Sequence, residues 1–246
     1  MASTASVRFD QLTPSRVMSI MAHPDDIDVS ASATIAKYIK QGAEVEYLIL
    51  TDGGKGSDDV TMTTEDLIKL RQNEQRGGLA AVGGKPQNVT FLPYGDGELE
   101  NTLALKRDIV REIRRFKPDV VITLDPTVIY SESTGRINHP DHRAAGQAVL
   151  DSVFPLARDR LTFPDLAVEG LSPHKVSTVL LVDFDRANYY ENITDTFQYK
   201  ELAIDAHPSQ FANPAVVKAI FKDIASKNGE LAGCEQAEGF IRLDID

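Results

Sequence analysis

The stretch VMSIMAHPDD, residues 17–26, joins an apolar run directly to a cluster of polar residues. Its apolar part, Val17–Ala22, is typical of a strand that is buried on both faces of a sheet. The proline after His23 disfavours helical geometry at that histidine, so Asp25 and Asp26 should lie in a turn just beyond the strand. The stretch therefore predicts a strand whose carboxyl end carries a group of ionisable side chains.

Apolar runs of the same kind recur along the chain, and helical patterns separate the first of them. We expect strands at Val17–Ala22, Val45–Thr51, Val89–Tyr94, Val120–Leu124 and Val176–Phe184. We expect helices around Ile35 and Ile39, over Glu65–Val82, and from Leu105 to Phe116. This alternation predicts a Rossmann-like α/β fold in a single domain over residues 1–246, with a mostly parallel sheet and helices on both of its faces. In the second helix, Gly77 and Gly78 weaken the expectation of a continuous element.

The composition limits the partners of the protein. A formal net charge of -11 disfavours binding to a phosphate backbone, so no nucleic-acid partner is expected. The sequence has neither an apolar run long enough to span a bilayer nor the pattern of a signal peptide, so we expect a cytoplasmic protein without a membrane partner. The single cysteine, Cys234, excludes an internal disulfide. A homo-oligomer is compatible with the sequence, which specifies no oligomeric state.

A second polar cluster, NHPDHRAAG at residues 138–146, repeats the His-Pro-Asp sequence of the first. The chain has 5 histidines, and three of them lie in these two clusters. Pro140 suits the first turn of a helix and Asp141 its acidic start, so His139 and His142 should face one crevice. Ligands of such sheets bind at the carboxyl ends of the strands, so the two clusters predict one shared site.

Together the clusters offer the donors of a hydrolytic metal site. Catalytic zinc takes three protein ligands and keeps one position for water, and His23, Asp26 and one histidine of the second cluster could supply them. Asp25 would then lie beside the metal as a general base. Three alternatives stay open: either aspartate could cap the next helix, the same donors could bind Fe(II) in a non-haem enzyme, and the cluster could bind metal or sugar without catalysis.

Four motifs make the sequence similar to the LmbE-like or PIG-L deacetylase family. They are AHPDD at residues 22–26, PYGDGEL at 93–99, KPDVVITLDP at 117–126 and HPDHRAAG at 139–146. The resemblance covers the chain from about Val17 to Phe154. It implies an enzyme with one Zn²⁺ per chain that removes the acetyl group from a small N-acetylglucosamine-type amide, giving acetate and a free amine.

The resemblance also implies roles for individual residues. The zinc ligands would be His23, Asp26 and His142, the general base Asp25, and the pair that stabilises the oxyanion His139 with Asp141. Two positions depart from the family pattern. Ile27 stands where the family usually has Glu, and Ile137 stands where some members have Tyr. Both departures concern substrate contacts and the proton donor rather than the metal ligands.

Other polar residues are candidates for the walls of this site. Arg71 matches a family pattern and could bind substrate, or it could pair with Glu74 within a helix. Asp96 could bind sugar hydroxyls or shape its Tyr-Gly-Asp-Gly turn. The segment TDGGKGSDD, residues 51–59, could cradle a phosphate or be an ordinary loop at the pocket. His207 adjoins a proline and could border the site.

Overall fold

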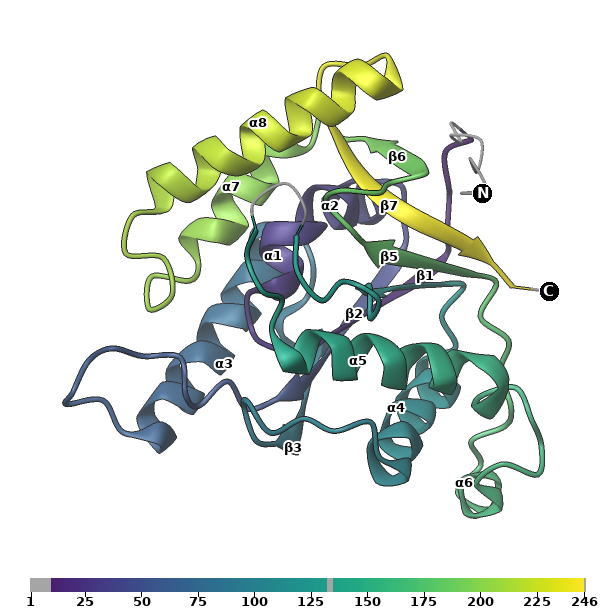
Figure 1. Ribbon diagram of the computed structural model, residues 1–246. Helices are drawn as coiled ribbons and strands as arrows, with labels where there is room; N and C mark the ends of the chain where they lie inside the picture. The colour runs from purple at the N-terminus through teal and green to yellow at the C-terminus, as the bar shows by residue number, and fades with distance from the viewer. Residues whose placement is uncertain (1–9, 132–134, 246) are drawn as a thin grey trace.

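A single seven-stranded sheet forms the centre of the computed structural model, with strand order β3-β2-β1-β4-β5-β7-β6 (Figure 1). The structure describes residues 10–131 and 135–245, so residues 1–9, 132–134 and 246 of the expected domain lie outside the described part. The strands are β1 (Arg16–Met21), β2 (Glu44–Thr51), β3 (Val89–Tyr94), β4 (Val120–Leu124), β5 (Thr178–Val182), β6 (Tyr189–Asn192) and β7 (Ala237–Asp244).

The five strands from β1 to β5 pair in parallel, and two antiparallel strands extend the sheet beyond them. β7 pairs antiparallel with β5, and β6 pairs antiparallel with β7. The expected mostly parallel Rossmann-like sheet is therefore confirmed, whereas β6 and β7 are elements that the sequence pattern did not indicate. β4 and β5 are buried along their whole length, as strands covered on both faces must be.

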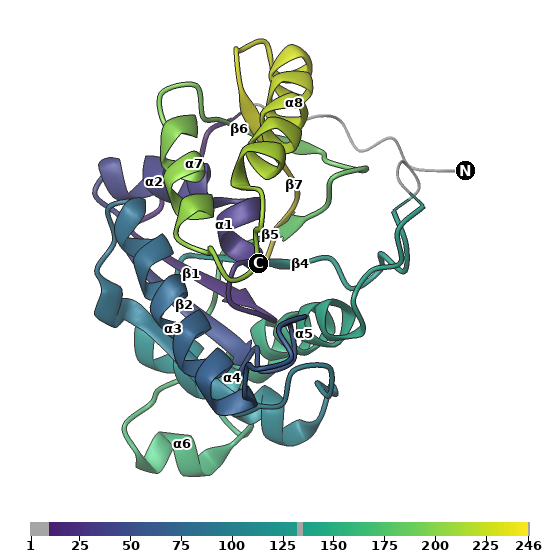
Figure 2. The ribbon, with the colours of Figure 1, turned by 90° about the vertical axis from the view of Figure 1, so that its left-hand side faces the viewer.

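The helices cover the two faces of the sheet in two groups (Figures 1 and 2). The elements are α1 (Asp26–Ser30), α2 (Ser32–Lys40), α3 (Thr64–Ala81), α4 (Leu103–Phe116), α5 (Pro140–Asp151), α6 (Pro164–Val168), α7 (Phe197–Asp205) and α8 (Pro214–Ala232). α7 packs against α1, α2 and α3, while α4 packs against α5. The expectation of helices on both faces is confirmed.

The helix α3 is continuous through its two glycines. Thr63 caps its N-terminus by accepting a hydrogen bond from the backbone N–H of Asp66. A Cβ atom at Gly78 would lie 2.5 Å from Oδ2 of Asp28, so α3 can approach α1 this closely only without a side chain there. The glycine that weakens the helix locally is required by its packing.

The order of the strands brings the two polar clusters together. β1 has β2 on one side and β4 on the other, so the chain leaves β1 and β4 in loops that lie next to each other at the carboxyl edge of the sheet. The loop after β1 leads into α1, and the loop after β4 leads into α5. This is the point at which open α/β sheets form their ligand-binding crevice.

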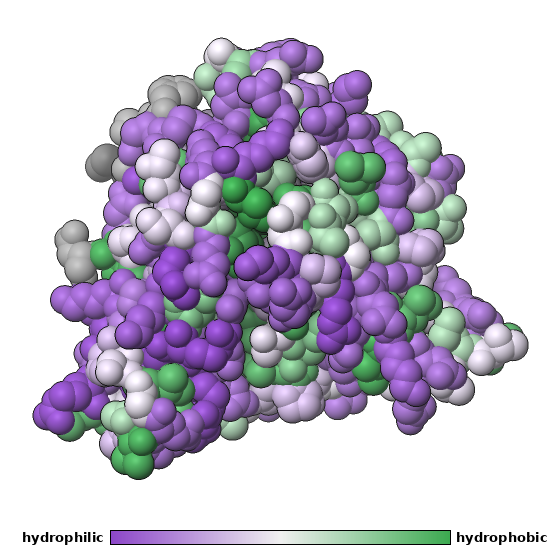
Figure 3. Space-filling model, turned by 180° about the vertical axis from the view of Figure 1, so that it is seen from behind, coloured by the Kyte–Doolittle hydropathy of each residue, from purple (hydrophilic) through white to green (hydrophobic). Residues whose placement is uncertain are grey.

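The outer surface agrees with an ordinary globular protein. On the face opposite to the view of Figure 1, hydrophilic side chains cover most of the molecule, with smaller apolar patches between them (Figure 3). Among residues 10–131 and 135–245, no helix combines the length and the apolar character that crossing a bilayer requires.

Candidate active site

Asp25 occupies an unusual backbone conformation at the end of β1. It is the N-cap residue of α1, with φ 95° and ψ −29°, and its side chain makes no capping hydrogen bond. Non-glycine residues with positive φ are uncommon because Cβ crowds the following carbonyl. The carboxylate of Asp25 therefore does not cap α1, so the alternative that this residue is only a helix cap is wrong.

Three side chains from the two clusters form a potential metal site. Single donor atoms of His23, Asp26 and His142 all lie within 4.8 Å of one another. Nε2 of His142 is 3.1 Å from Oδ1 of Asp26, and Nδ1 of His23 is 3.5 Å from Oδ2 of Asp26. His23 lies in the loop after β1, Asp26 begins α1 and His142 lies in the first turn of α5, so the fold brings together the residues that the sequence indicated.

The second ring nitrogen of each histidine has a partner that fits a role as metal ligand. Nδ1 of His142 lies 3.0 Å from Oδ1 of Asn138, and Nε2 of His23 lies 3.2 Å from Oδ2 of Asp141. Metal-binding histidines nearly always use the second nitrogen in this way, which fixes the ring and its tautomer. Two imidazoles and one carboxylate are also the donor set of open zinc sites, so these residues fit zinc.

A second group of donors, His23, Asp96 and His139, lies close enough to hold a metal as well. It shares His23 with the first group, and Oδ1 of Asp96 approaches Nε2 of that residue at 3.3 Å. That nitrogen already has Asp141 beside it. In the first group, both histidines have an orienting partner for the second ring nitrogen, so this group is the better candidate for a metal site.

The electrostatics of the cluster favour a bound cation. Burial disfavours the charged form of His23, but the carboxylates of Asp141, Asp26 and Asp96 outweigh burial and raise the pKa of this imidazole far above its ordinary value. Burial also opposes ionisation of Asp26, yet His142 and His23 hold the pKa of this carboxyl well below its ordinary value. Asp26 is therefore ionised, as a carboxylate that binds a metal must be, and its negative charge is balanced by the neighbouring His142 and His23.

Asp25 differs from Asp26 although the two are adjacent. Burial and the charge of Asp26 raise the pKa of the Asp25 carboxyl, and the Arg71 guanidinium counteracts only part of this shift. Nη2 of Arg71 lies 3.2 Å from Oδ2 of Asp25. A carboxylate with raised affinity for a proton is suited to general base catalysis near neutral pH.

His139 has the most exposed side chain of the three clustered histidines, at 41%. Its Nδ1 accepts a hydrogen bond from the backbone N–H of Asp141 at 3.2 Å, so in its neutral form the proton is on Nε2. Burial and the charge of His23 lower the pKa of His139, which favours that neutral form. His139 can thus donate a hydrogen bond from Nε2.

The carboxylate of Asp141 has a different partner from the one that the sequence suggested. It lies 4.0 Å from Nδ1 of His139 but only 3.2 Å from Nε2 of His23. It also accepts hydrogen bonds from the backbone N–H groups of Gly97 and Leu99. Asp141 holds His139 through its main chain and orients His23 through its side chain.

Arg71 lies inside the wall of the site, with its side chain 5% exposed. Its guanidinium donates to the carbonyl oxygens of Gly53 and Pro24, which joins the loops after β2 and β1. The intrahelical pair with Glu74 is not formed, because the Glu74 carboxylate instead accepts hydrogen bonds from the backbone N–H and the hydroxyl of Ser209.

Asp96 is buried beside both Arg71 and the potential metal site. Its Oδ2 accepts a hydrogen bond from the backbone N–H of Lys55 and lies 3.7 Å from Nη1 of Arg71. The pKa of Asp96 falls to about 2, chiefly because of the hydrogen bond with His23. Its ionised carboxylate therefore shapes the turn and the site together.

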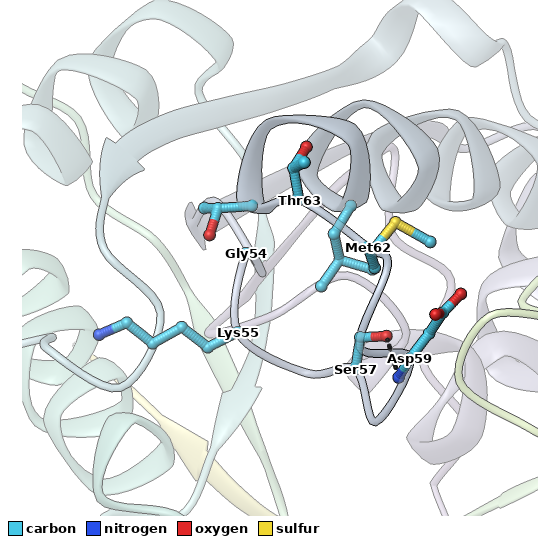
Figure 4. A pocket seen from close by; sticks show the side chains of 8 residues that line it. Gly54, Lys55, Ser57, Asp59, Met62 and Thr63 are labelled. Carbon is cyan, nitrogen blue, oxygen red and sulfur yellow. Dashed lines mark hydrogen bonds between the residues drawn. The ribbon is translucent and has the colours of Figure 1, made fainter.

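The loop at residues 51–59 borders a pocket at the N-terminus of α3 (Figure 4). Its backbone N–H groups at Gly54 and Lys55 donate to the carboxylates of Asp52 and Asp96. Donors that already bind carboxylates are not free to cradle a phosphate. The interpretation as an ordinary loop at the pocket is the better one.

Sequence reasoning missed two residues that orient the site, Asn138 and Gln75. Asn138 is the first residue of the second cluster, directly before the HPDH motif, and this position was the available signal. Gln75 accepts a hydrogen bond from the backbone N–H of Asp25 at 2.8 Å, although it lies 50 positions away in the sequence. No local pattern marks such a contact. His207, which the sequence left as one candidate for the border of the site, is fully buried behind it and contacts Asp28.

Fold and site together define an α/β protein with a potential His/Asp/His metal centre at the carboxyl edge of a mainly parallel sheet. The chain belongs to the GlcNAc-PI de-N-acetylase (PIG-L) family, whose model matches residues 18–153.

Known relatives resemble the chain over most of its length. Diacetylchitobiose deacetylase of Thermococcus kodakarensis is 31% identical, over 91% of this chain and 81% of the relative. A probable N-acetyl-alpha-D-glucosaminyl L-malate deacetylase 2 of Bacillus anthracis is 27% identical, over 80% of this chain and 81% of the relative. Among solved structures, N,N'-diacetylchitobiose deacetylase from Pyrococcus horikoshii in complex with its inhibitor MPG has a TM-score of 0.85 and 29% identity, covering 94% of this chain and 84% of that one.

Proposed function

We propose that the protein is a zinc-dependent hydrolase that removes the acetyl group from a small N-acetylglucosamine-type sugar and releases acetate and a free amine. The observation that carries the proposal is the group His23, Asp26 and His142 with Asp25 beside it. The deacetylase relatives support the same reaction class. A spare carboxylate with raised proton affinity favours an enzyme over a site that only binds metal.

Zinc held by His23, Asp26 and His142 would polarise the amide carbonyl and activate water for attack on it. Asp25 takes the proton of the attacking water, since it is the carboxyl of the site whose pKa is raised. Arg71 holds the charged form of Asp25 in place through the contact at Oδ2. The proton can then pass to the amine that leaves.

His139 is suited to stabilise the negative charge that develops on the carbonyl oxygen. Its Nδ1 is occupied by the backbone N–H of Asp141, so Nε2 is the nitrogen left to donate. Donors fixed before the reaction stabilise an oxyanion without reorganising. Asp141 contributes by fixing both His139 and His23.

Arg71 and Asp96 are proposed to shape the substrate pocket, each through a buried side chain that joins neighbouring loops. The match of the Thermococcus kodakarensis relative over 91% of the chain supports one domain. A cytoplasmic location stays a prediction from the sequence, which is compatible with a homo-oligomer but specifies no oligomeric state.

The test is to incubate the zinc-loaded protein with a panel of N-acyl amines and to detect new primary amine. The panel contains N-acetylglucosamine, N,N'-diacetylchitobiose and a non-sugar acetamide, with the Asp25→Asn variant as control. Amine release from the sugars, at the same rate with and without oxygen, supports the proposal and excludes an oxygen-dependent iron enzyme. Absence of amine from every member of the panel, with zinc bound at one per chain, would overturn it.

A further inference from the structure

We infer that Gln75 is a positioning residue for Asp25, and that Asp28 and His207 hold Gln75 in the required orientation. The inference rests on the proposed function, in which Asp25 is the general base. It concerns a buried network behind the metal site, formed by residues from α1, from α3 and from the loop after α7.

The backbone of Asp25 needs such support. Its φ of 95° is costly for a residue with a Cβ atom, and strained residues persist only where their surroundings over-determine them. Among the described residues, only Asp25, Lys117 and Phe163 combine a side chain with positive φ. Asp25 is the one of the three that lies in the site.

Two side chains of α3 hold the strained turn from one side. Oε1 of Gln75 accepts a hydrogen bond from the backbone N–H of Asp25 at 2.8 Å. One turn earlier in the same helix, Nη2 of Arg71 donates to the carbonyl oxygen of Pro24 at 2.8 Å and contacts the Asp25 carboxylate. Gln75 thus fixes the main chain of Asp25, while Arg71 contacts its side chain.

The orientation of the Gln75 amide is determined by its second partner. Nε2 of Gln75 donates to Oδ2 of Asp28 at 2.7 Å, so exchanging the amide oxygen and nitrogen would place acceptor against acceptor. The same Asp28 oxygen lies 2.7 Å from Nε2 of His207. All three side chains are fully buried. Asp28 is therefore the anchor that turns the Gln75 oxygen toward Asp25.

A contribution to stability does not explain why Gln75, Asp28 and His207 are polar. Oδ1 of Asp28 and Nδ1 of His207 are buried and have no hydrogen-bond partner within the described ranges. Burying an ion pair with unsatisfied atoms gains little over apolar packing, so stability does not account for these residue types. Precise placement of the Asp25 backbone does account for them, because small errors in the position of a catalytic group reduce turnover strongly.

The first test compares Gln75→Met with Gln72→Met, a control on the same helix. Met has nearly the shape of Gln but cannot accept the hydrogen bond of Asp25. We expect Gln75→Met to reduce kcat by about 10- to 100-fold, with KM and zinc content nearly unchanged. In the Asp25→Asn background the same substitution should change kcat by less than about twofold, since residues that act through one another are not additive. An equal loss in both backgrounds would mean that Gln75 has only a structural role.

The second test does not depend on activity. Hydrogen exchange of the Asp25 amide is measured in the zinc-loaded wild type and in both variants. Protection of the Asp25 amide should be lost in Gln75→Met and retained in Gln72→Met. Unchanged protection in Gln75→Met overturns the inference even if no substrate is cleaved.

If Gln75→Met fails to fold, Gln75→Asn replaces it. Its polar side chain is too short to reach both Asp25 and Asp28, so the same losses of kcat and of amide protection are expected. If the wild type releases no amine while the exchange result holds, the proposed function fails and the positioning contact stands.

Discussion

At the scale of single residues, the adjacent Asp25 and Asp26 divide the work of the site. Asp26 is kept ionised by two histidines, which suits a metal ligand, whereas burial and the charge of Asp26 give Asp25 a raised affinity for a proton. Their backbones differ as well, because Asp25 is the left-handed N-cap and Asp26 the first residue of α1. The proposed metal ligand and the proposed general base are therefore adjacent residues in the sequence.

Replacing Asp25 by Asn tests this division. Asn keeps the shape and tolerates the left-handed backbone, but it cannot take a proton from water. Turnover should fall by about 100- to 10,000-fold, the usual contribution of a general base. Zinc content should be unchanged, as measured by metal analysis of both proteins. If zinc is lost together with activity, Asp25 is a ligand and the roles of the two aspartates are exchanged.

The pH dependence follows from the raised pKa of Asp25. The carboxyl must be ionised to act as a base, so activity is lost as the pH falls through its pKa. Because that pKa is raised, the acidic limb of kcat/KM should lie above the range of an ordinary aspartate, which is about 3.9. The limb should be altered in Asp25→Asn. A wild-type profile that stays flat down to pH 4 contradicts the assignment.

Asn138 provides a test of how the metal ligands are oriented. Its Oδ1 holds Nδ1 of His142, so Asn138→Ala should lower zinc affinity by about 10- to 100-fold, as loss of such partners typically does. His139→Ala should retain zinc and lose turnover instead. Competition with a chelator of known affinity measures the first effect. Equal zinc affinity in wild type and Asn138→Ala would remove Asn138 from the site.

The group of His23, Asp26 and His142 was predictable because two short motifs contain all three residues, and the parallel strands place the ends of β1 and β4 at one edge of the sheet. The partner of the Asp141 carboxylate was not predictable. It depends on the N–H groups of Gly97 and Leu99, which come from the turn after β3, far from the cluster in sequence. Asn138 was within reach, since it directly precedes the motif.

At the scale of elements, α3 is the helix that connects the site to its support. It carries Arg71 and Gln75 on the side that faces the end of β1, and Gly78 one turn further on allows close contact with Asp28. The spacing of these residues places them along one face of the helix.

The two glycines of α3 form a matched pair for a stability test. A methyl group at Gly78 would meet Asp28, whose carboxylate is fixed by Gln75 and His207, so Gly78→Ala should destabilise by about 1–3 kcal/mol. At Gly77 the nearest atom would be 3.6 Å away, so Gly77→Ala should stabilise by about 0.5–1 kcal/mol through helix propensity. Denaturant unfolding measures both. Equal effects of the two substitutions would contradict the close packing.

The five parallel strands were predictable from their apolar runs, whereas β6 and β7 were not. β6 has 4 residues, which is too short to show a period. β7 is partly exposed toward its end and contains charged residues, so it lacks the continuous apolar character of a central strand. The pairing of β7 with β5 and of β6 with β7 therefore could not be read from the sequence of either strand.

At the scale of the whole molecule, Glu238 ties the antiparallel extension to the helices next to the site. From β7 its carboxylate accepts hydrogen bonds from the backbone N–H groups of Ala33 and Thr34 at the start of α2, and it pairs with Lys200 of α7 at 2.5 Å. All of these groups are buried. One side chain thus joins a strand to two helices.

Glu238→Ala should therefore lower the free energy of unfolding by about 3–5 kcal/mol, because it leaves Lys200 as a buried charge without its partner. The exposed neighbour Glu235→Ala should change stability by no more than about 0.5 kcal/mol. Zinc affinity, measured below the unfolding transition, should be similar in both variants. A small effect of Glu238→Ala would show that the extension contributes little to the fold.

The position of β7 also bears on the order in which the protein can assemble during synthesis. β6 forms its ladder with β7, and β7 is later in the sequence than every other strand of the sheet. A growing chain can pair β1 to β5 and bring the two histidine clusters together before residues 237–244 exist, yet β6 must wait with an open edge. Unpaired edges are where nascent chains associate wrongly. A ribosome paused shortly before Ala237 would hold a protein whose two histidine clusters are already together but whose sheet is still open to other chains.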